Sequence, residues 1–317
     1  MALKVEVRSS ATLSEGDSWF GVCPKCRRAF PPLEISAPSY FRDGAVNCPD
    51  CHARIDLWDA AKSQVADDFP PEWALQFLGA HLTFVELEMQ PGHVVTVDLT
   101  KYGVPVSAVL LHSAYQMNDA RAIPRPIQLH TNELARDPAR QTLYCIPIEG
   151  AAMDPGPAHG VVCWFQKTED SQAAGRIVNA VRDLAMKDVD GCVVEAFSAF
   201  EIALFTFISR HLDRFCRSEA IKTVLEGKLS AYQMMELLPS LCEELGVARP
   251  PSIVWQKLHE LRKCRNDLLH KGHSDAMGLS AAGDFLAAAL IGVAFVSYVE
   301  KGAAFYDASA VKPPDRS

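Results

Sequence analysis

Two closely spaced cysteine pairs near the N-terminus constrain the fold of this chain more than any other feature. Cys23 and Cys26 form the first pair, and Cys48 and Cys51 form the second. Two Cys-x-x-Cys turns at this separation can supply four thiolates to one tetrahedral Zn²⁺ ion. The intervening residues are rich in proline and cannot form a large core, so we predict that the metal holds this small zinc ribbon together. Four ligands leave no open position, which makes the zinc structural.

The partner of this ribbon is not decided by its charge. Residues Phe20 to Asp56 carry five basic and four acidic side chains, and one zinc with four thiolates adds −2. This charge balance does not favour binding of nucleic acid by the ribbon. Arg27 and Arg28 beside Trp19 and nearby phenylalanines could still stack on bases. Two interpretations therefore remain, namely a structural or protein-contact module and a small nucleic-acid contact.

Hydrophobic periodicity divides the rest of the chain into a β-rich and a helical part. Six segments are predicted strands, namely Leu82–Met89, Val94–Leu99, Val106–Tyr115, Ile127–Thr131, Thr142–Ile148 and Val161–Gln166. Six segments are predicted helices, namely Asp170–Asp188, Val193–Phe215, Glu219–Leu225, Ala231–Leu245, Ile253–Lys271 and Ser280–Phe305. We predict three domains: a zinc ribbon with linker over residues 1–70, a small antiparallel β-sandwich over 71–168 and a helical bundle over 169–317. The β-rich part contains no motif that assigns it a function.

The helix predicted over Ile253–Lys271 carries the residues that are the best candidates for a catalytic site. Two prolines precede it, and Gly272 can end it in the left-handed conformation. Arginine binds phosphate with a fixed fork of donors, and histidine moves protons near neutral pH. Arg265 and His270 in its last turns therefore suffice to propose metal-independent cleavage of RNA. At about 100° per residue, Asn266 and His270 lie on nearly one face, whereas Arg265 lies about 140° from His270.

This segment resembles the signature of the HEPN superfamily of four-helix domains. Leu258-His259-Glu260-Leu261-Arg262, followed by Arg265-Asn266 through His270, is similar to the Arg-Asn-x-x-x-His run late in a helix of that family. Val194 to Leu204, with two glutamates among alanines and large apolar residues, is similar to its first helix. The resemblance covers residues 191–305 and implies a helical bundle. It implies either an endoribonuclease that leaves a 2′,3′-cyclic phosphate or a non-catalytic module that binds RNA, nucleotides or proteins.

The resemblance also implies roles for individual residues. His270 would be the general acid or base, Arg265 would stabilise the phosphate, and Asn266 would hold the substrate or His270. Glu201 stands among large apolar residues and needs a partner, so it either orients Arg265 or reaches solvent at the helix edge. Glu195 lies on another face and is expected to be exposed. As an alternative, the cationic side chains only stabilise the end of the helix, where positive charge is favoured.

Catalytic HEPN domains usually pair, which implies a homodimer through the helical domain. Family members that cleave RNA often serve as prokaryotic toxins or antiviral effectors, and the ribbon and sandwich would then sense a trigger or bind a regulatory partner. The net charge of −8 gives no general affinity for nucleic acid, but Lys257 to His273 holds five basic and two acidic side chains. A solvated helix face explains this excess equally well.

The N-terminus has no apolar signal core, and the most apolar run, Phe285–Val299, is shorter than the ~20 residues that span a bilayer. We therefore expect a cytoplasmic protein without a membrane segment, in a compartment where cysteines stay reduced. The six cysteines outside the two pairs stand among apolar residues and are expected to be small buried side chains.

Overall fold

The structure, a computed structural model of the chain, separates into two compact units. The first unit comprises Met1–Asp17 and Gly79–Ser171, and the second comprises Ser18–Leu78 and Gln172–Ser317. The residues whose placement is described are 6–9, 23, 25–26, 41, 45–48, 50–66, 80–89, 94–98, 106–116, 125–126, 128–131, 140–146, 156–166, 171–215, 227–247, 249–272 and 277–307. The first unit thus interrupts the second along the sequence.

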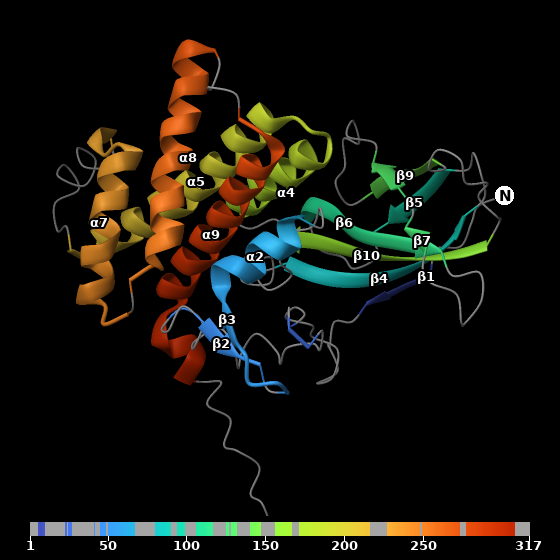
Figure 1. The fold of residues 1–317 in the computed structure, drawn as a ribbon, viewed down its shortest axis with the longest axis horizontal. Coiled ribbons are helices and arrows are strands. Elements are labelled where there is room, and N and C mark those ends of the chain that lie inside the picture. Colours follow the sequence, from blue (N-terminus) through green and yellow to red (C-terminus); the bar gives the residue numbers. More distant parts are fainter. Residues whose placement is uncertain are drawn as a thin grey trace, which may run out of the picture. The chain divides into compact units, whose positions relative to one another are not determined.

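The first unit contains two antiparallel sheets. The larger sheet has five strands in the order β1-β4-β10-β6-β7. These strands are β1 (Glu6–Ser9), β4 (Ala80–Met89), β6 (Val106–Gln116), β7 (Arg125–Pro126) and β10 (Gly156–Gln166). The smaller sheet has the order β5-β9-β8, with strands β5 (Val94–Asp98), β8 (Gln128–Thr131) and β9 (Arg140–Ile146). Figure 1 shows β10 between β4 and β6, and its register with β4 runs from Gly156 opposite Met89 to Phe165 opposite Ala80.

The predicted fold class is wrong for this part of the chain, because no β-sandwich is seen in the described residues. Each of the six predicted strand segments does contain a strand, but the strands belong to two separate sheets. β1 joins the edge of the larger sheet from outside residues 71–168. Where side chains are described, the chain is predominantly helical. Alternating hydrophobicity predicts which residues are extended, but it does not determine which strands pair or whether two sheets pack face to face.

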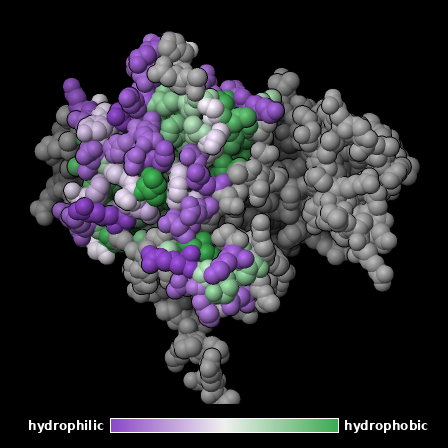
Figure 2. Space-filling model, viewed as in Figure 1, coloured by the Kyte–Doolittle hydropathy of each residue, from purple (hydrophilic) through white to green (hydrophobic). Residues whose placement is uncertain are grey.

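The second unit is built from helices around α9. Its long helices are α4 (Ser171–Ala185), α5 (Val189–Phe215), α7 (Ala231–Glu244), α8 (Ser252–Lys271) and α9 (Leu279–Asp307). α9 packs against α5 and α8, and α5 also contacts α7 and α8. Every residue of α9 from Phe285 to Val296 is buried. A helix that is apolar all round must be covered on all sides, which explains why α9 is central. Figure 2 shows that much of the described surface of this unit is hydrophilic.

Gly292 sets the distance at which α5 and α8 approach α9. A Cβ atom at this position would lie 2.9 Å from Cδ2 of Phe200 and 3.0 Å from Cδ1 of Leu258. Glycine is the residue that leaves this space free. Phe200 and Leu258 are both buried, so neither can turn into solvent to make room. The close packing of α5 and α8 against α9 therefore requires a residue without a side chain at position 292.

The cysteine segment belongs to the helical unit and covers part of α9. It contains a hairpin of β2 (Ala45–Asn47) and β3 (Arg54–Asp56), followed directly by α2 (Leu57–Ala66), which packs on α9 (Figure 1). Phe41 is 1% exposed, and its ring centroid lies 5.6 Å from that of Phe295 and 5.0 Å from that of Tyr298. Lys62 Nζ lies 3.1 Å from Asp284 Oδ1. Nothing in the local sequence pattern predicts this docking.

The ends of α8 agree with the prediction for its segment. The helix begins at Ser252, one residue before the predicted start, with Pro251 at its N-cap. It ends at Lys271, and Gly272 has a φ of 74° and donates its N–H to the carbonyl of Leu268. The left-handed helix end at Gly272 is thus confirmed. The short helix predicted over Glu219–Leu225 lies outside the described residues.

Two helical windows, Val189–His211 and Leu279–Val299, are long and apolar enough to cross a membrane by length and composition. Half of the first window and 72% of the second are buried inside the structure. The second window is longer than the run Phe285–Val299 that the sequence singled out. Core helices of soluble proteins meet the same criterion, so the two windows are weak evidence for a membrane span. The cytoplasmic location stays a prediction.

Candidate functional site

The four paired cysteines come together in one cluster beside the β2–β3 hairpin. Cys48 directly follows β2, and its N–H donates to the carbonyl of Ala53 at 2.8 Å. The N–H of His52 donates to the carbonyl of Cys48 at 2.9 Å, and His52 has a φ of 54°. This tight turn places Cys51 close to Cys48. In the first pair, the N–H of Cys26 points to the sulfur of Cys23 at 3.5 Å, which turns both thiols of that pair to one side.

The cluster has the dimensions of a metal site. The four sulfur atoms all lie within 4.8 Å of one another. The Sγ atoms of Cys23 and Cys51 are 3.7 Å apart, and those of Cys26 and Cys48 are 3.6 Å apart. Both distances far exceed the roughly 2.05 Å of a disulfide bond, so these sulfur atoms are not joined in disulfides. The four cysteines could therefore hold a metal ion. His52, next to Cys51, is exposed and is not a member of this group.

The environment of Cys23 favours its thiolate form. Burial opposes ionisation of this thiol, because a charged sulfur is less stable away from water. The backbone N–H groups of Cys26 and Lys25 and the thiols of Cys26 and Cys51 outweigh burial and lower the pKa of Cys23 from 9.0 to about 7. A thiolate is the form that binds a metal.

Two further cysteines behave differently. Cys192 and Cys242 are buried, as expected for cysteines among apolar residues. Burial, with the carboxylates of Asp183 and Asp188, raises the pKa of Cys192 to about 12. Burial also raises the pKa of Cys242 to about 11, with Arg249 opposing it. Both thiols are therefore protonated near neutral pH, and in this they differ from the Cys23 thiol of the cluster.

A second candidate site lies where α5 meets the C-terminal half of α8. Arg265 of α8 places Nη2 at 3.6 Å from Oε2 of Glu201 on α5. Its Nη1 donates to Oδ1 of Asn266 at 3.2 Å. The guanidinium carbon stands 5.7 Å from the ring centroid of Phe197, one turn before Glu201 on α5. Three of the four residues singled out in the sequence, Arg265, Asn266 and Glu201, are thus brought together.

Phe197 is the member of this site that the sequence did not suggest. It is 1% exposed, and its ring provides an apolar surface for the guanidinium. The spacing of Phe197 and Glu201 places them on one face of α5, and this is the signal that could have indicated a shared partner. Nε of Arg265 is buried and has no hydrogen-bond partner among the described residues. The side chains of Arg265 and Glu201 are 26% and 32% exposed, so the ion pair remains accessible from solvent.

His270 is not part of this contact set. It is exposed in the last turn of α8, one turn beyond Asn266, and makes no hydrogen bond or ion pair with the described part of the chain. Its neighbours Asp267 and Lys271 pair with each other at 2.7 Å. The hydrogen bond from Lys271, together with the positive charges of Lys271 and Lys263, lowers the pKa of Asp267. The imidazole is therefore free to reach a bound molecule but is not oriented by a neighbouring side chain.

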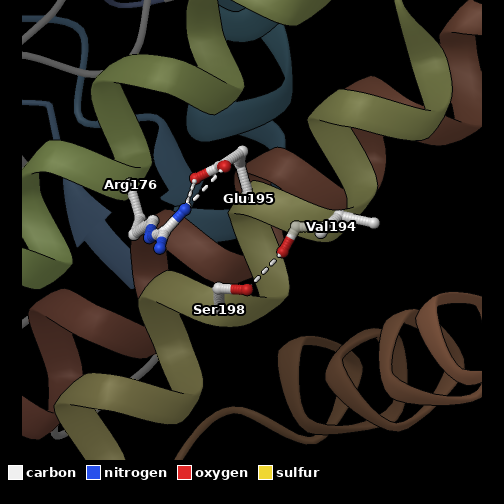
Figure 3. Close-up of polar contacts among 4 residues, drawn as sticks. All are labelled: Arg176, Val194, Glu195 and Ser198. Carbon is white, nitrogen blue, oxygen red and sulfur yellow. Dashed lines mark hydrogen bonds and ion pairs between the residues drawn. The ribbon is translucent and has the colours of Figure 1, made fainter. Parts of the chain in front are cut away.

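Glu195 is not exposed as expected but pairs with α4. Figure 3 shows it facing Arg176, whose Nη1 lies 2.7 Å from Oε1 and 3.0 Å from Oε2 of Glu195. Its side chain is only 19% exposed. Ser198, in the same view, donates its hydroxyl to the carbonyl of Val194 at 2.7 Å. The two glutamates of α5 thus hold two different arginines, and only Glu201 belongs to the candidate site.

Comparison of the chain with protein-family models, with curated proteins and with solved structures found no match.

Proposed function

We propose that this protein is a metal-independent endoribonuclease of the HEPN type. The observation that carries the proposal is the Arg265 guanidinium, positioned by Glu201 and Phe197 and bonded to Asn266, on the same helix as the exposed His270 five residues later. A phosphate-binding group and a proton-transfer group at one helix end are the minimum for this reaction. Solvent access to Arg265 leaves room for a phosphate beside the ion pair.

The reaction is an attack of a ribose 2′-oxygen on the adjacent phosphorus. A bond forms between the 2′-oxygen and phosphorus, the bond to the 5′-oxygen breaks, and a 2′,3′-cyclic phosphate remains. His270 removes the proton of the 2′-hydroxyl or protonates the departing 5′-oxygen, which contributes about 10²–10⁴-fold to the rate. Arg265 stabilises the negative charge of the transition state. Asn266 positions the ribose, the phosphate or His270 by a hydrogen bond.

A single His270 supplies only one of the two proton transfers in this step. We therefore propose a homodimer in which two helical units face each other and two copies of the Arg265–His270 segment share one substrate. The exposure of His270 and Leu269, at 55% for Leu269, is compatible with a second subunit at this helix end. In this arrangement one imidazole is the base and the other is the acid.

We propose zinc as the metal of the cysteine cluster. Zn–S bonds of about 2.3 Å place the sulfur atoms of a tetrahedral site roughly 3.8 Å apart. The measured distances of 3.6 and 3.7 Å fit this spacing. Cys23, Cys26, Cys48 and Cys51 would fill all four positions, so the ion would stabilise the fold and take no part in cleavage. The reduced thiols suit a cytoplasmic location, which is likewise a proposal.

The test is cleavage of a labelled single-stranded RNA by the purified protein in buffer without divalent metal. We expect the wild type to cut and His270→Ala to be inactive, with Ile253→Ala, which is 36% exposed at the other end of α8, as the control. The 5′ product should carry a 2′,3′-cyclic phosphate, and a strand with 2′-deoxyribose throughout should stay intact. Cleavage by His270→Ala at the wild-type rate would refute the assigned role.

The second candidate function is a non-catalytic module that binds RNA, a nucleotide or a protein. It is favoured by the same ion pair, since Glu201 already compensates the charge of Arg265, and by the lack of an orienting partner for His270 among the described residues. Binding of single-stranded RNA by the wild type and by His270→Ala alike, without cutting by either, would support this alternative.

A further inference from the structure

An aromatic–arginine cluster lies between α7 and α8. It consists of Tyr232 on α7 and of Trp255, His259 and Arg262 on α8. The guanidinium carbon of Arg262 stands 5.0 Å from the ring centroid of Tyr232. The ring of His259 meets Tyr232 edge to face at 6.2 Å and Trp255 edge to face at 5.4 Å. Tyr232 is 47% exposed, so part of its ring is open to solvent.

The cluster shares one face of α8 with the proposed cleavage residues. At 100° per residue, Trp255, His259, Arg262, Asn266 and His270 fall within an arc of about 80°. With a rise of 1.5 Å per residue, Arg262 lies about 6 Å from Asn266 and about 12 Å from His270 along the helix axis. A bound chain that follows this face would pass from the cluster to the cleavage residues without a change of direction.

Arg262 has no anionic partner in the part of the chain that the structure describes. Its Nε is buried without a hydrogen bond among the described residues, and its guanidinium lies over the ring of Tyr232. Among the other cations of α8, Lys257 is paired with Glu260 at 2.7 Å and Arg265 with Glu201 at 3.6 Å. Glu236 faces His259, with its Oε1 3.9 Å from Nε2 of the imidazole. Arg262 therefore remains available for an external anion.

His259 contributes an aromatic ring and no net charge. Burial lowers the pKa of His259, Arg262 lowers it further, and Glu236 opposes the shift. The ring is thus neutral near pH 7, and its 28% exposed side chain extends the aromatic surface from Trp255 toward Tyr232. A surface of edge-to-face rings with one guanidinium offers contacts for a base and for a phosphate together.

We propose that the aromatic–arginine cluster binds an unpaired nucleotide of a single-stranded RNA next to the cleaved position. The base stacks on the exposed part of Tyr232, and Arg262 contacts the neighbouring phosphate. Such stacking platforms bind single strands with little sequence preference, because every base has a flat aromatic face. The inference rests on the proposed ribonuclease function, since it is the position of Asn266 and His270 that makes RNA the ligand.

The test uses a fluorescein-labelled single-stranded RNA of mixed sequence that is fully 2′-O-methylated. This probe lacks the attacking hydroxyl, so its affinity for the full-length wild-type protein is measured by anisotropy independently of cleavage. Tyr232→Ala should weaken binding by about 5- to 140-fold, which is the usual stacking contribution expressed as affinity. Tyr232→Phe keeps the ring and should bind like the wild type. Leu237→Ala, an exposed apolar residue at 41% on another face of α7, is the matched control.

Arg262→Gln gives a readout that a purely structural role would not change. If Arg262 contacts a phosphate, the slope of log affinity against log salt should become shallower by about 0.7. Equal affinity of the wild type and Tyr232→Ala would overturn the proposal. It would also be overturned if Tyr232→Ala changed only the sedimentation of a dimer and not the affinity for the probe.

Failure of this proposal and failure of the ribonuclease can be told apart. If cleavage of unmodified RNA depends on His270 but Tyr232→Ala does not change binding of the probe, the proposal for the aromatic–arginine cluster is refuted and the ribonuclease proposal stands. If Tyr232→Ala weakens binding of the probe but the wild type does not cleave RNA, the ribonuclease proposal is refuted and the cluster is a binding site for single-stranded RNA.

Discussion

Phe41→Ala tests whether the cysteine segment is part of the helical core. Phe41 is 1% exposed and contacts Phe295 and Tyr298 of α9 through its ring. Truncation of a buried phenylalanine to alanine costs about 3–5 kcal/mol, which combines lost transfer energy with the cavity that remains. The loss of two aromatic contacts places the expected value in the upper part of this range. The measurement is urea unfolding of the metal-loaded protein, followed by the circular dichroism of the helices.

The control for this experiment is Phe205→Ala, the same truncation at a position that is 41% exposed on α5. It should cost less than half as much as Phe41→Ala, because its side chain is only partly removed from water. A helical transition that is the same in Phe41→Ala and in the wild type would refute the reasoning. It would mean that α9 is stable without its cover from the cysteine segment.

Three further predictions concern the core, the Arg265 site and the metal. Gly292→Ala should destabilise the helical unit by about 1–3 kcal/mol in the same unfolding experiment, because the added methyl group meets buried side chains at 2.9 and 3.0 Å. Glu201→Gln should change stability by less than about 1 kcal/mol, since the pair is partly exposed, but should reduce RNA cleavage about tenfold or more. Metal affinity should fall on acidification: the pKa of Cys23, lowered from 9.0 to about 7, keeps its thiolate present below the ordinary thiol pKa, and the thiolate is lost as the pH falls through 7.

Each of these three predictions has a control or a contrary outcome. Gly283→Ala is the comparison for Gly292→Ala, since a Cβ atom there meets only Val65, at an ordinary 3.5 Å. Glu195→Gln, which releases Arg176 on another face of α5, should leave cleavage unchanged. Metal release is followed with a chromogenic chelator. A metal content that stays constant from pH 8 to pH 5 would contradict the role given to Cys23.

The sequence predicts local structure well where its signals are local. α8 was placed to within one residue because Pro251 and Gly272 mark its ends, and the spacing of the four cysteines foresaw their cluster. The contact of Arg265 with Glu201 was one of two alternatives, since an ionised group among large apolar residues requires a partner.

Contacts between distant segments were the part that could not be predicted. Phe41 and Phe295 are in contact although most of the chain lies between them in the sequence. The spacing of apolar residues along the sequence does not indicate contacts of this kind. The assignment of the strands to a sandwich was wrong for the same reason, because alternation does not determine sheet packing. Glu195 was expected in solvent, but its partner Arg176 comes from a helix whose placement the sequence did not define.

The long stretch of chain between the cysteine segment and α9 has a consequence for synthesis. The cysteine segment leaves the ribosome early, whereas the helix that it covers is completed more than two hundred residues later. At the usual rate of about 5–20 residues per second, this interval lasts roughly 10–50 s. During that time Phe41 has no α9 to pack on, while the intervening β-rich unit has already been synthesised. Early metal capture or a chaperone would protect the nascent chain during this wait.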